Sequence, residues 1–251
     1  MPTSPLRLPT GPARTRLRLA VLAALVLLVA GVVVLADGVT GGTATGSRPS
    51  RCDVYVAGSQ ARAAAVTGSG ADVLVVGDSW SAGLGLDDPS QSWARQLPGT
   101  VHVAAFSGSG FGALASPCGP RFSFAARMHD ALLTVDEDAP VVVMGGLNDW
   151  DLPDAAVAAG FARVVRAVGA VGEHDLVVVG PAPAPSRAVQ AQHVDGLLSR
   201  LAADAGVTYV SVIDVTGLNY LSDDLHLSAA SHRTFGRLVA GRLADAGVAL
   251  G

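Results

Sequence analysis

Short valine-rich stretches that recur after residue 72 constrain the fold of this chain more than any other feature. The middle stretches are apolar at nearly every position, which is typical of strands buried on both faces of a sheet. The stretches are DVLVVG (72–77), VHVAAF (101–106), VVVMGG (141–146), LVVVG (176–180) and VTYVSVI (207–213). Helical patterns cover 121–133, 153–169, about 187–205 and about 228–246. Strands that alternate with helices predict an α/β fold, in which a five-stranded parallel sheet carries helices on both faces.

An uncharged stretch near the N-terminus, LAVLAALVLLVAGVVVLA (19–36), predicts a membrane segment. It has about the minimum length of a membrane-spanning helix. The arginines of residues 1–18 lie before it, and the positive-inside rule keeps that side in the cytoplasm. We therefore predict a transmembrane signal anchor whose following residues lie outside the cytoplasm. Cleavage before Asp37, which would release a secreted protein, is the alternative.

The composition changes after the apolar stretch. Residues 37–50 are rich in Gly, Thr and Ser and show no apolar periodicity, which is typical of a flexible linker. Residues 51–251 are then predicted to form one extracytoplasmic domain. All 21 acidic residues of the chain follow the leader, whereas four of the 17 basic residues precede it. The outer part is therefore acidic, which argues against nucleic-acid binding.

The chain contains two cysteines, Cys52 and Cys118. Outside the cytoplasm such a pair tends to oxidise, so we predict a disulfide between them. A cysteine nucleophile is the alternative, but neither cysteine lies in a sequence context that is typical of one.

Candidate reactive residues follow the ends of the predicted strands. Ser79 follows the first strand, Gly108 the second and Asn148 the third, and Asp223 and His226 follow the last. Ligands of parallel α/β sheets bind beyond the carboxyl ends of the strands. These residues are therefore expected to meet at one edge of the sheet.

The residue types suit hydrolysis of an ester. A serine hydroxyl such as that of Ser79 becomes a good nucleophile when a base removes its proton, and His226 can be that base. The carboxylate of Asp223 would orient the imidazole and stabilise its charged form. The backbone N–H of Gly108 and the amide of Asn148 would stabilise the oxyanion.

The same residues carry a resemblance to a known family. VVGDSWS, FSGSG, GGLND and DDLH resemble the four sequence blocks of the SGNH hydrolases, also called GDSL-type lipases and esterases. The resemblance spans about residues 72–246. It implies a three-layer α/β/α, flavodoxin-like fold with Ser79 as nucleophile, His226 as base and Asp223 as the third triad member. It also implies that the N–H of Ser79 joins Gly108 and Asn148 in the oxyanion hole.

Some positions depart from the family pattern or leave a choice open. Trp80 stands where the family often has Leu, and Leu227 where it often has Pro. Gly110 competes with Gly108 for the oxyanion role. Asp224 competes with Asp223, although only Asp223 has the three-residue offset from His226.

Two tryptophans beside these residues have two interpretations. Trp80 and Trp150 either pack in the core or form a wall that binds a sugar or an acyl chain. The remaining histidines lack the spacing of metal ligands and are interpreted as structural. They are His102, His129, His174, His193 and His232.

These observations predict a serine esterase that needs no metal or cofactor. The expected substrates are small acyl esters or acylated glycans, including O-acetyl groups of envelope carbohydrate. Acyl transfer to a sugar by the same triad is one alternative. A non-catalytic envelope-binding module on the same fold is another, although binding alone has no need for Ser79, His226 and Asn148 together.

Overall fold

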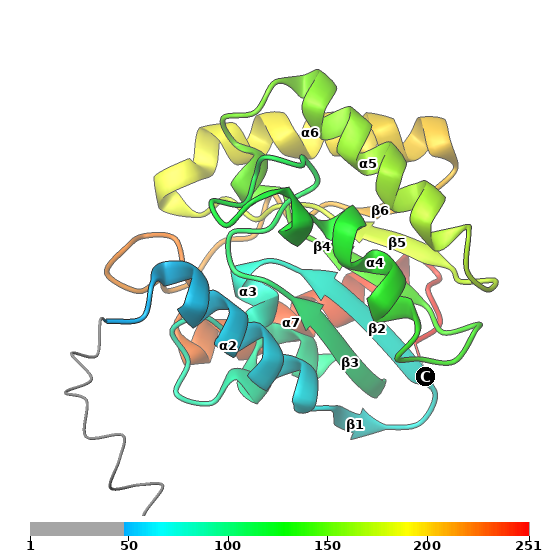
Figure 1. Cartoon of the computed structure of the whole chain (residues 1–251), viewed down its shortest axis with the longest axis horizontal. Coiled ribbons are helices and arrows are strands. Elements are labelled where there is room, and N and C mark those ends of the chain that lie inside the picture. Colours follow the sequence, from blue (N-terminus) through cyan, green and yellow to red (C-terminus); the bar gives the residue numbers. More distant parts are fainter. Residues whose placement is uncertain (1–47, 251) are drawn as a thin grey trace, which may run out of the picture. The chain divides into compact units, whose positions relative to one another are not determined.

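A mixed six-stranded sheet with helices on both faces is the frame of the domain (Figure 1). The computed structural model of the chain describes residues 48–250. The strand order is β1-β3-β2-β4-β5-β6, and all neighbours are parallel except β1 and β3. The strands are β1 (Thr67–Ser69), β2 (Asp72–Gly77), β3 (Gly99–Ala105), β4 (Val141–Met144), β5 (Leu176–Val179) and β6 (Thr208–Val210).

The predicted α/β architecture is confirmed, but the prediction of a five-stranded, purely parallel sheet is wrong at one edge. Strand β1 pairs antiparallel with β3 and adds a sixth strand. Its three residues, Thr-Gly-Ser, contain no apolar side chain, so no hydrophobic pattern marks it.

The central strand β2 shows why the valine-rich stretches are apolar throughout. Val73 and Val75 point into a core that includes Trp93 and Phe235. Alternate residues, such as Leu74, point into the opposite core. Both faces of the strand are buried, so neither set of positions tolerates polar side chains.

The helices divide between these two cores. Helices α4 (Phe124–Leu132), α5 (Asp154–Val168) and α6 (Ala188–Ala205) pack on the face of Leu74. Helix α7 (Ala229–Asp245) packs on the opposite face. The four helices that were predicted after residue 120 are therefore present, with ends that differ from the prediction by at most three residues.

The chain also has a helix that the strand–helix alternation did not predict. Helix α2 (Arg51–Ala64) packs against β3. Ser50 caps it, because the Ser50 hydroxyl accepts the N–H of Asp53 while the Asp53 carboxylate accepts the N–H of Ser50. This capping box was the signal in the sequence that could have located the helix.

The predicted cytoplasmic segment (1–18) and anchor (19–36) lie outside the described residues, as does most of the predicted linker (37–50). Within residues 48–250, no helix combines the length and the apolar character needed to cross a bilayer. Anchor, linker and cellular location therefore remain predictions.

A disulfide joins α2 to the long loop after β3. Cys52 and Cys118 are bonded, with their Cα atoms 5.7 Å apart. The predicted disulfide is thus confirmed. It closes a sequence separation of 66 residues, which restricts the unfolded chain.

Replacing both cysteines by serine should lower the free energy of unfolding by about 4 kcal/mol, because the unfolded chain regains the entropy that the closed loop removes. Urea denaturation of the variant and of the wild type measures the difference. Reduction of the wild type should move its midpoint toward that of the double variant. Equal midpoints for all three samples would contradict the prediction.

Candidate active site

Ser79 is the first residue of the short helix α3 (Ser79–Ala82), directly beyond the carboxyl end of β2. Asp78 caps this helix by accepting the N–H of Trp80 at 2.9 Å. A side chain at Gly77 would collide with that of Ser81, so only glycine fits at the strand end. The buried strand thus ends in a tight turn, which presents Ser79 at the edge of the sheet.

His226 reaches Ser79 from the loop between β6 and α7. The Nε2 atom of His226 lies 3.0 Å from the Oγ atom of Ser79. A bridge between Tyr220 and Leu227, together with a hydrogen bond from the Leu221 N–H to the His226 carbonyl, holds this loop. The structure therefore brings together two residues that are 147 positions apart.

Asp223 completes a continuous chain of polar contacts. Its Oδ2 atom lies 2.6 Å from Nδ1 of His226, and its Oδ1 atom accepts the N–H groups of Leu225 and His226. Burial alone would raise the pKa of Asp223, but these hydrogen bonds with His226 and Leu225 lower it to about 2. The carboxylate is therefore ionised at neutral pH and can stabilise an imidazolium.

Asp224 does not take this place. Its backbone is in the left-handed region, with φ of 52°, and its carbonyl accepts hydrogen bonds from the N–H and hydroxyl of Ser186. Of the two aspartates, Asp223 is the one whose carboxylate contacts His226.

Gly108 and Asn148 line the same cavity as Ser79 and His226. Gly108 has φ of +81°, and a Cβ atom on it would lie 2.9 Å from Cδ of Pro117. Both the positive φ and the close approach of Pro117 therefore exclude a side chain at Gly108. Gly110 instead packs against the carboxylate of Asp149 and does not line the cavity.

The side-chain amide of Asn148 is held from both ends. Its Nδ2 atom donates to the carbonyl of Ser109 at 2.9 Å, and its Oδ1 atom accepts from Arg187 at 3.0 Å. The second hydrogen of Nδ2 remains available to a bound oxyanion.

Two residues around Asn148 were missed by the sequence analysis. Arg187 orients its amide, and Asp149 accepts the N–H groups of Phe111 and Gly112 in the loop beyond Gly108. Asp149 could have been found, because it follows Asn148 in GGLND. Arg187 has no signal, since only the tertiary fold brings it to Asn148.

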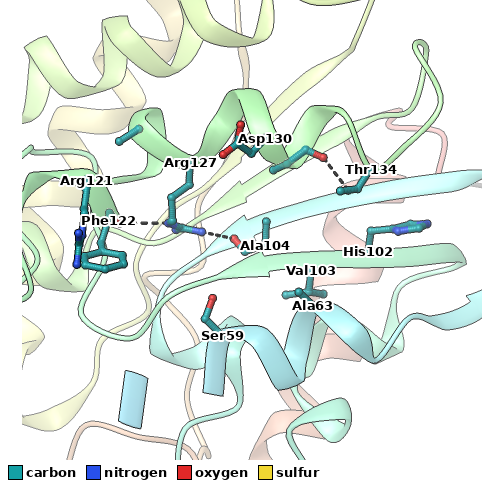
Figure 2. A pocket seen from close by; sticks show the side chains of 12 residues that line it. Ser59, Ala63, His102, Val103, Ala104, Arg121, Phe122, Arg127, Asp130 and Thr134 are labelled. Carbon is teal, nitrogen blue, oxygen red and sulfur yellow. Dashed lines mark hydrogen bonds between the residues drawn. The ribbon is translucent and has the colours of Figure 1, made fainter. Parts of the chain in front are cut away.

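Behind the loop of Gly108, a half-buried arginine connects the strand ends. Arg127 of α4 donates to the carbonyls of Gly77 and Ala104 and to the hydroxyl of Ser109. Figure 2 shows it on the wall of a separate groove between α2 and α4. Arg127 therefore ties the end of β2, which leads to Ser79, to the loop that carries Gly108.

The cavity above Ser79 has a volume of about 360 Å³ and a mainly polar lining. Trp150 forms part of it, is 44% exposed, and has the guanidinium of Arg187 over its ring at 5.5 Å. The position of Trp150 is thus compatible with its interpretation as a wall that binds a sugar or an acyl chain. Within residues 48–250, no group of three or more His, Cys, Asp or Glu side chains could hold a metal ion.

Trp80 does not form part of the cavity, so its interpretation as a substrate-binding wall is wrong. It is 1% exposed and packs edge-on against Phe235 at 5.1 Å. Its indole N–H donates to the carbonyl of Leu225 at 3.1 Å. Trp80 therefore supports the loop of His226 from the core, because the helix turn after Ser79 directs its side chain inward.

Asp78 should make stability depend on pH. Burial raises the pKa of Asp78 from 3.8 to about 7. Between these values the folded state keeps a proton that the unfolded state has lost, so this group lowers stability as the pH rises. Asp78→Asn cannot ionise and keeps an oxygen for the Trp80 N–H. Its stability relative to the wild type should therefore improve by a few kcal/mol, at most about 4, between pH 4 and pH 7.

Urea denaturation at pH 4, 5, 6 and 7 measures this difference. The exposed Asp87 offers a matched control, and Asp87→Asn should keep a nearly constant offset from the wild type across the series. A constant offset for Asp78→Asn would contradict a raised pKa for Asp78.

Comparison with known proteins identifies the family that this chain resembles. A model of the GDSL-like Lipase/Acylhydrolase family matches residues 75–234, which is more than half of the chain. No curated protein matches the chain significantly.

Solved structures share the fold at low sequence identity. Est24, a carbohydrate acetylesterase from Sinorhizobium meliloti, has a TM-score of 0.56 and 19% identity, over 70% of this chain and 99% of its own. A putative arylesterase from Agrobacterium tumefaciens has a TM-score of 0.55 and 23% identity over the same shares. An aryl esterase from M. smegmatis has a TM-score of 0.54 and 20% identity, again over 70% and 99%.

Proposed function

The chain belongs to the GDSL-like lipase/acylhydrolase family and is a carboxylic ester hydrolase, and from this premise we propose that it cleaves small acyl esters through an acyl-Ser79 intermediate. The observation that carries the proposal is the hydrogen-bonded chain from Asp223 through His226 to Ser79, with contacts of 2.6 and 3.0 Å. These distances fit a nucleophile beside its base and a base beside its orienting group.

The reaction begins with attack of the Ser79 Oγ atom on the ester carbonyl carbon while His226 Nε2 takes the hydroxyl proton. The N–H groups of Ser79 and Gly108 and the amide of Asn148 stabilise the oxyanion. The intermediate then collapses, the C–O bond to the alcohol breaks, and His226 protonates that alcohol. Water attacks the acyl-Ser79 ester with His226 again as base, which releases the acid and restores Ser79.

The polar cavity favours a hydrophilic alcohol in the substrate. Asn148, Trp150, Asp151 and Arg187 line the space beside Ser79 and offer hydrogen bonds and an aromatic face. Such groups suit a sugar better than a long acyl chain. A carbohydrate acetylesterase among the proteins of similar fold adds support. We propose O-acetyl groups on carbohydrate as the substrate class.

The location is part of the same proposal. The uncharged stretch at 19–36, preceded by arginines, supports an anchored domain outside the cytoplasm. Its natural substrates would then be acetylated glycans of the cell envelope. Signal-peptide cleavage before Asp37, detected by mass spectrometry of the mature N-terminus, would replace the anchored form by a secreted one.

The test combines turnover with covalent labelling of the purified protein. We expect hydrolysis of p-nitrophenyl acetate, slower hydrolysis of p-nitrophenyl decanoate, and release of acetate from glucose pentaacetate. A serine-directed fluorophosphonate should add to Ser79, as located by peptide mass spectrometry. Absence of both turnover and a Ser79 adduct would refute the proposed function.

A further inference from the structure

Helix α2 lies outside the residues that the family model matches, yet it contributes to the cavity above Ser79. The family match begins at residue 75, whereas α2 ends at Ala64. Arg51 and Tyr55 of this helix nevertheless line the cavity, together with Ser79 and His226. The chain therefore places a helix from outside the matched range beside Ser79, in direct reach of a bound substrate.

Residues on one side of α2 line two separate hollows of the domain. Arg51, Tyr55, Ser59 and Ala63 are spaced four residues apart, which puts them on one side of a helix. The first two line the catalytic cavity, and the last two line the separate groove of Figure 2. The orientation of α2 thus assigns its N-terminal half to the substrate cavity.

Tyr55 lies next to the glycine that is proposed to bind the oxyanion. A Cβ atom on Gly108 would be 3.8 Å from Cε2 of Tyr55. The Tyr55 ring also packs at right angles to Phe106, with ring centres 6.0 Å apart. Because Phe106 stacks on Phe122 at 3.9 Å, the tyrosine rests against a fixed aromatic group.

The disulfide holds this arrangement together. Cys52 follows Arg51 in the first turn of α2, and Cys118 follows Pro117, which contacts Gly108. At the opposite end of α2, the buried side chain of Arg62 donates to the hydroxyl of Ser92 and to the carbonyl of Ala65. The helix is thus attached at both ends, and the covalent attachment is the one beside the cavity.

We infer that α2 forms a substrate-recognition wall, in which Tyr55 is a specificity-determining residue that contacts the alcohol part of the ester. This inference rests on the proposed function. An aromatic ring with a polar tip can pack on a sugar ring and hydrogen-bond to its hydroxyl or acetyl groups. Compact esters that do not extend to α2 lose little when the ring is removed, whereas acetylated sugars lose binding.

The test compares a sugar ester with a compact ester. Tyr55→Ala should raise the KM for glucose pentaacetate at least tenfold, while kcat/KM for ethyl acetate, whose alcohol part is two carbons long, and the rate of fluorophosphonate labelling stay within about threefold of the wild type. Tyr55→Phe, which keeps the ring, should give a smaller rise in KM. Ser59→Ala, on the same side of α2 but in the other groove, should leave every value unchanged.

Two outcomes would overturn the inference. One is an unchanged KM for glucose pentaacetate in Tyr55→Ala. The other is an equal loss with both esters and with the label, which would make Tyr55 a support of Gly108 instead of a contact with the alcohol. Circular dichroism verifies that each variant is folded.

A binding measurement separates this inference from the proposed function. Glucose pentaacetate should bind Ser79→Ala at least tenfold more tightly than the double variant Ser79→Ala with Tyr55→Ala, as measured by titration calorimetry. If the wild type lacks turnover and labelling but this difference in binding is present, the hydrolase proposal fails and the recognition wall stands. Equal binding by the two variants overturns the wall even if the wild type is active.

Discussion

Ser79→Ala should lower kcat for p-nitrophenyl acetate by about 10⁴-fold or more and abolish fluorophosphonate labelling. The alanine keeps the turn after β2 and the cap by Asp78, because neither uses the Ser79 hydroxyl. It removes the oxygen that lies 3.0 Å from His226. The variant should therefore stay folded and bind substrate while losing the nucleophile.

A spectrophotometric assay and mass spectrometry of labelled peptides measure this result. Ser59→Ala is the matched control, because Ser59 lines the separate groove between α2 and α4. Its turnover and labelling should equal those of the wild type. Retention of more than a tenth of the activity by Ser79→Ala would show that another group is the nucleophile.

His226→Ala should cause a loss of comparable size, because it removes the only histidine that contacts Ser79 among residues 48–250. Without this base the Ser79 hydroxyl keeps its proton at neutral pH, and the acid that protonates the leaving alcohol is lost with it. We expect kcat to fall by about 10⁴-fold or more. Fluorophosphonate labelling should slow in parallel, since it depends on the same activated oxygen.

His193 offers the matched control for this experiment. It also pairs with an aspartate, through a 2.7 Å contact between Nε2 and the Oδ1 atom of Asp154, but both side chains are exposed on the surface. His193→Ala should therefore retain wild-type activity. A His226→Ala variant that labels at the wild-type rate would contradict the role of His226 as base.

The strands and helices that could be predicted best from the sequence were those whose segments have a strong hydrophobic pattern. The bounds of strand β2 were predicted to the residue, because burial on both faces makes residues 73–76 a continuous apolar run between Asp72 and Gly77. Strand β6 ends at Val210, three residues before the predicted end, where Ser211 leaves the sheet and donates to Asp195. Strand β1 and helix α2 were missed, because neither has an apolar pattern of that strength.

The residues of the site also divide into those that the sequence could indicate and those that it could not. The residues next to strand ends could be proposed from the sequence, since parallel strands bring their carboxyl ends to one edge. Arg187, Arg127 and Tyr55 could not be proposed, because they reach the site from helices α4 and α2 and from the turn before α6. No local spacing encodes such contacts.

The sequence by itself determined the α/β class, the disulfide pair and the residues that were proposed as nucleophile, base and oxyanion donors. The fold class and the site residues follow from short-range patterns, in which neighbouring residues share a strand, a turn or a loop, whereas the disulfide pair follows from the chain having two cysteines. Only the tertiary structure decided that Trp80 belongs to the core, that Gly108 and not Gly110 lines the cavity, and that α2 forms one of its walls. These outcomes depend on which way side chains point once distant segments pack together, and packing is a property of the whole fold.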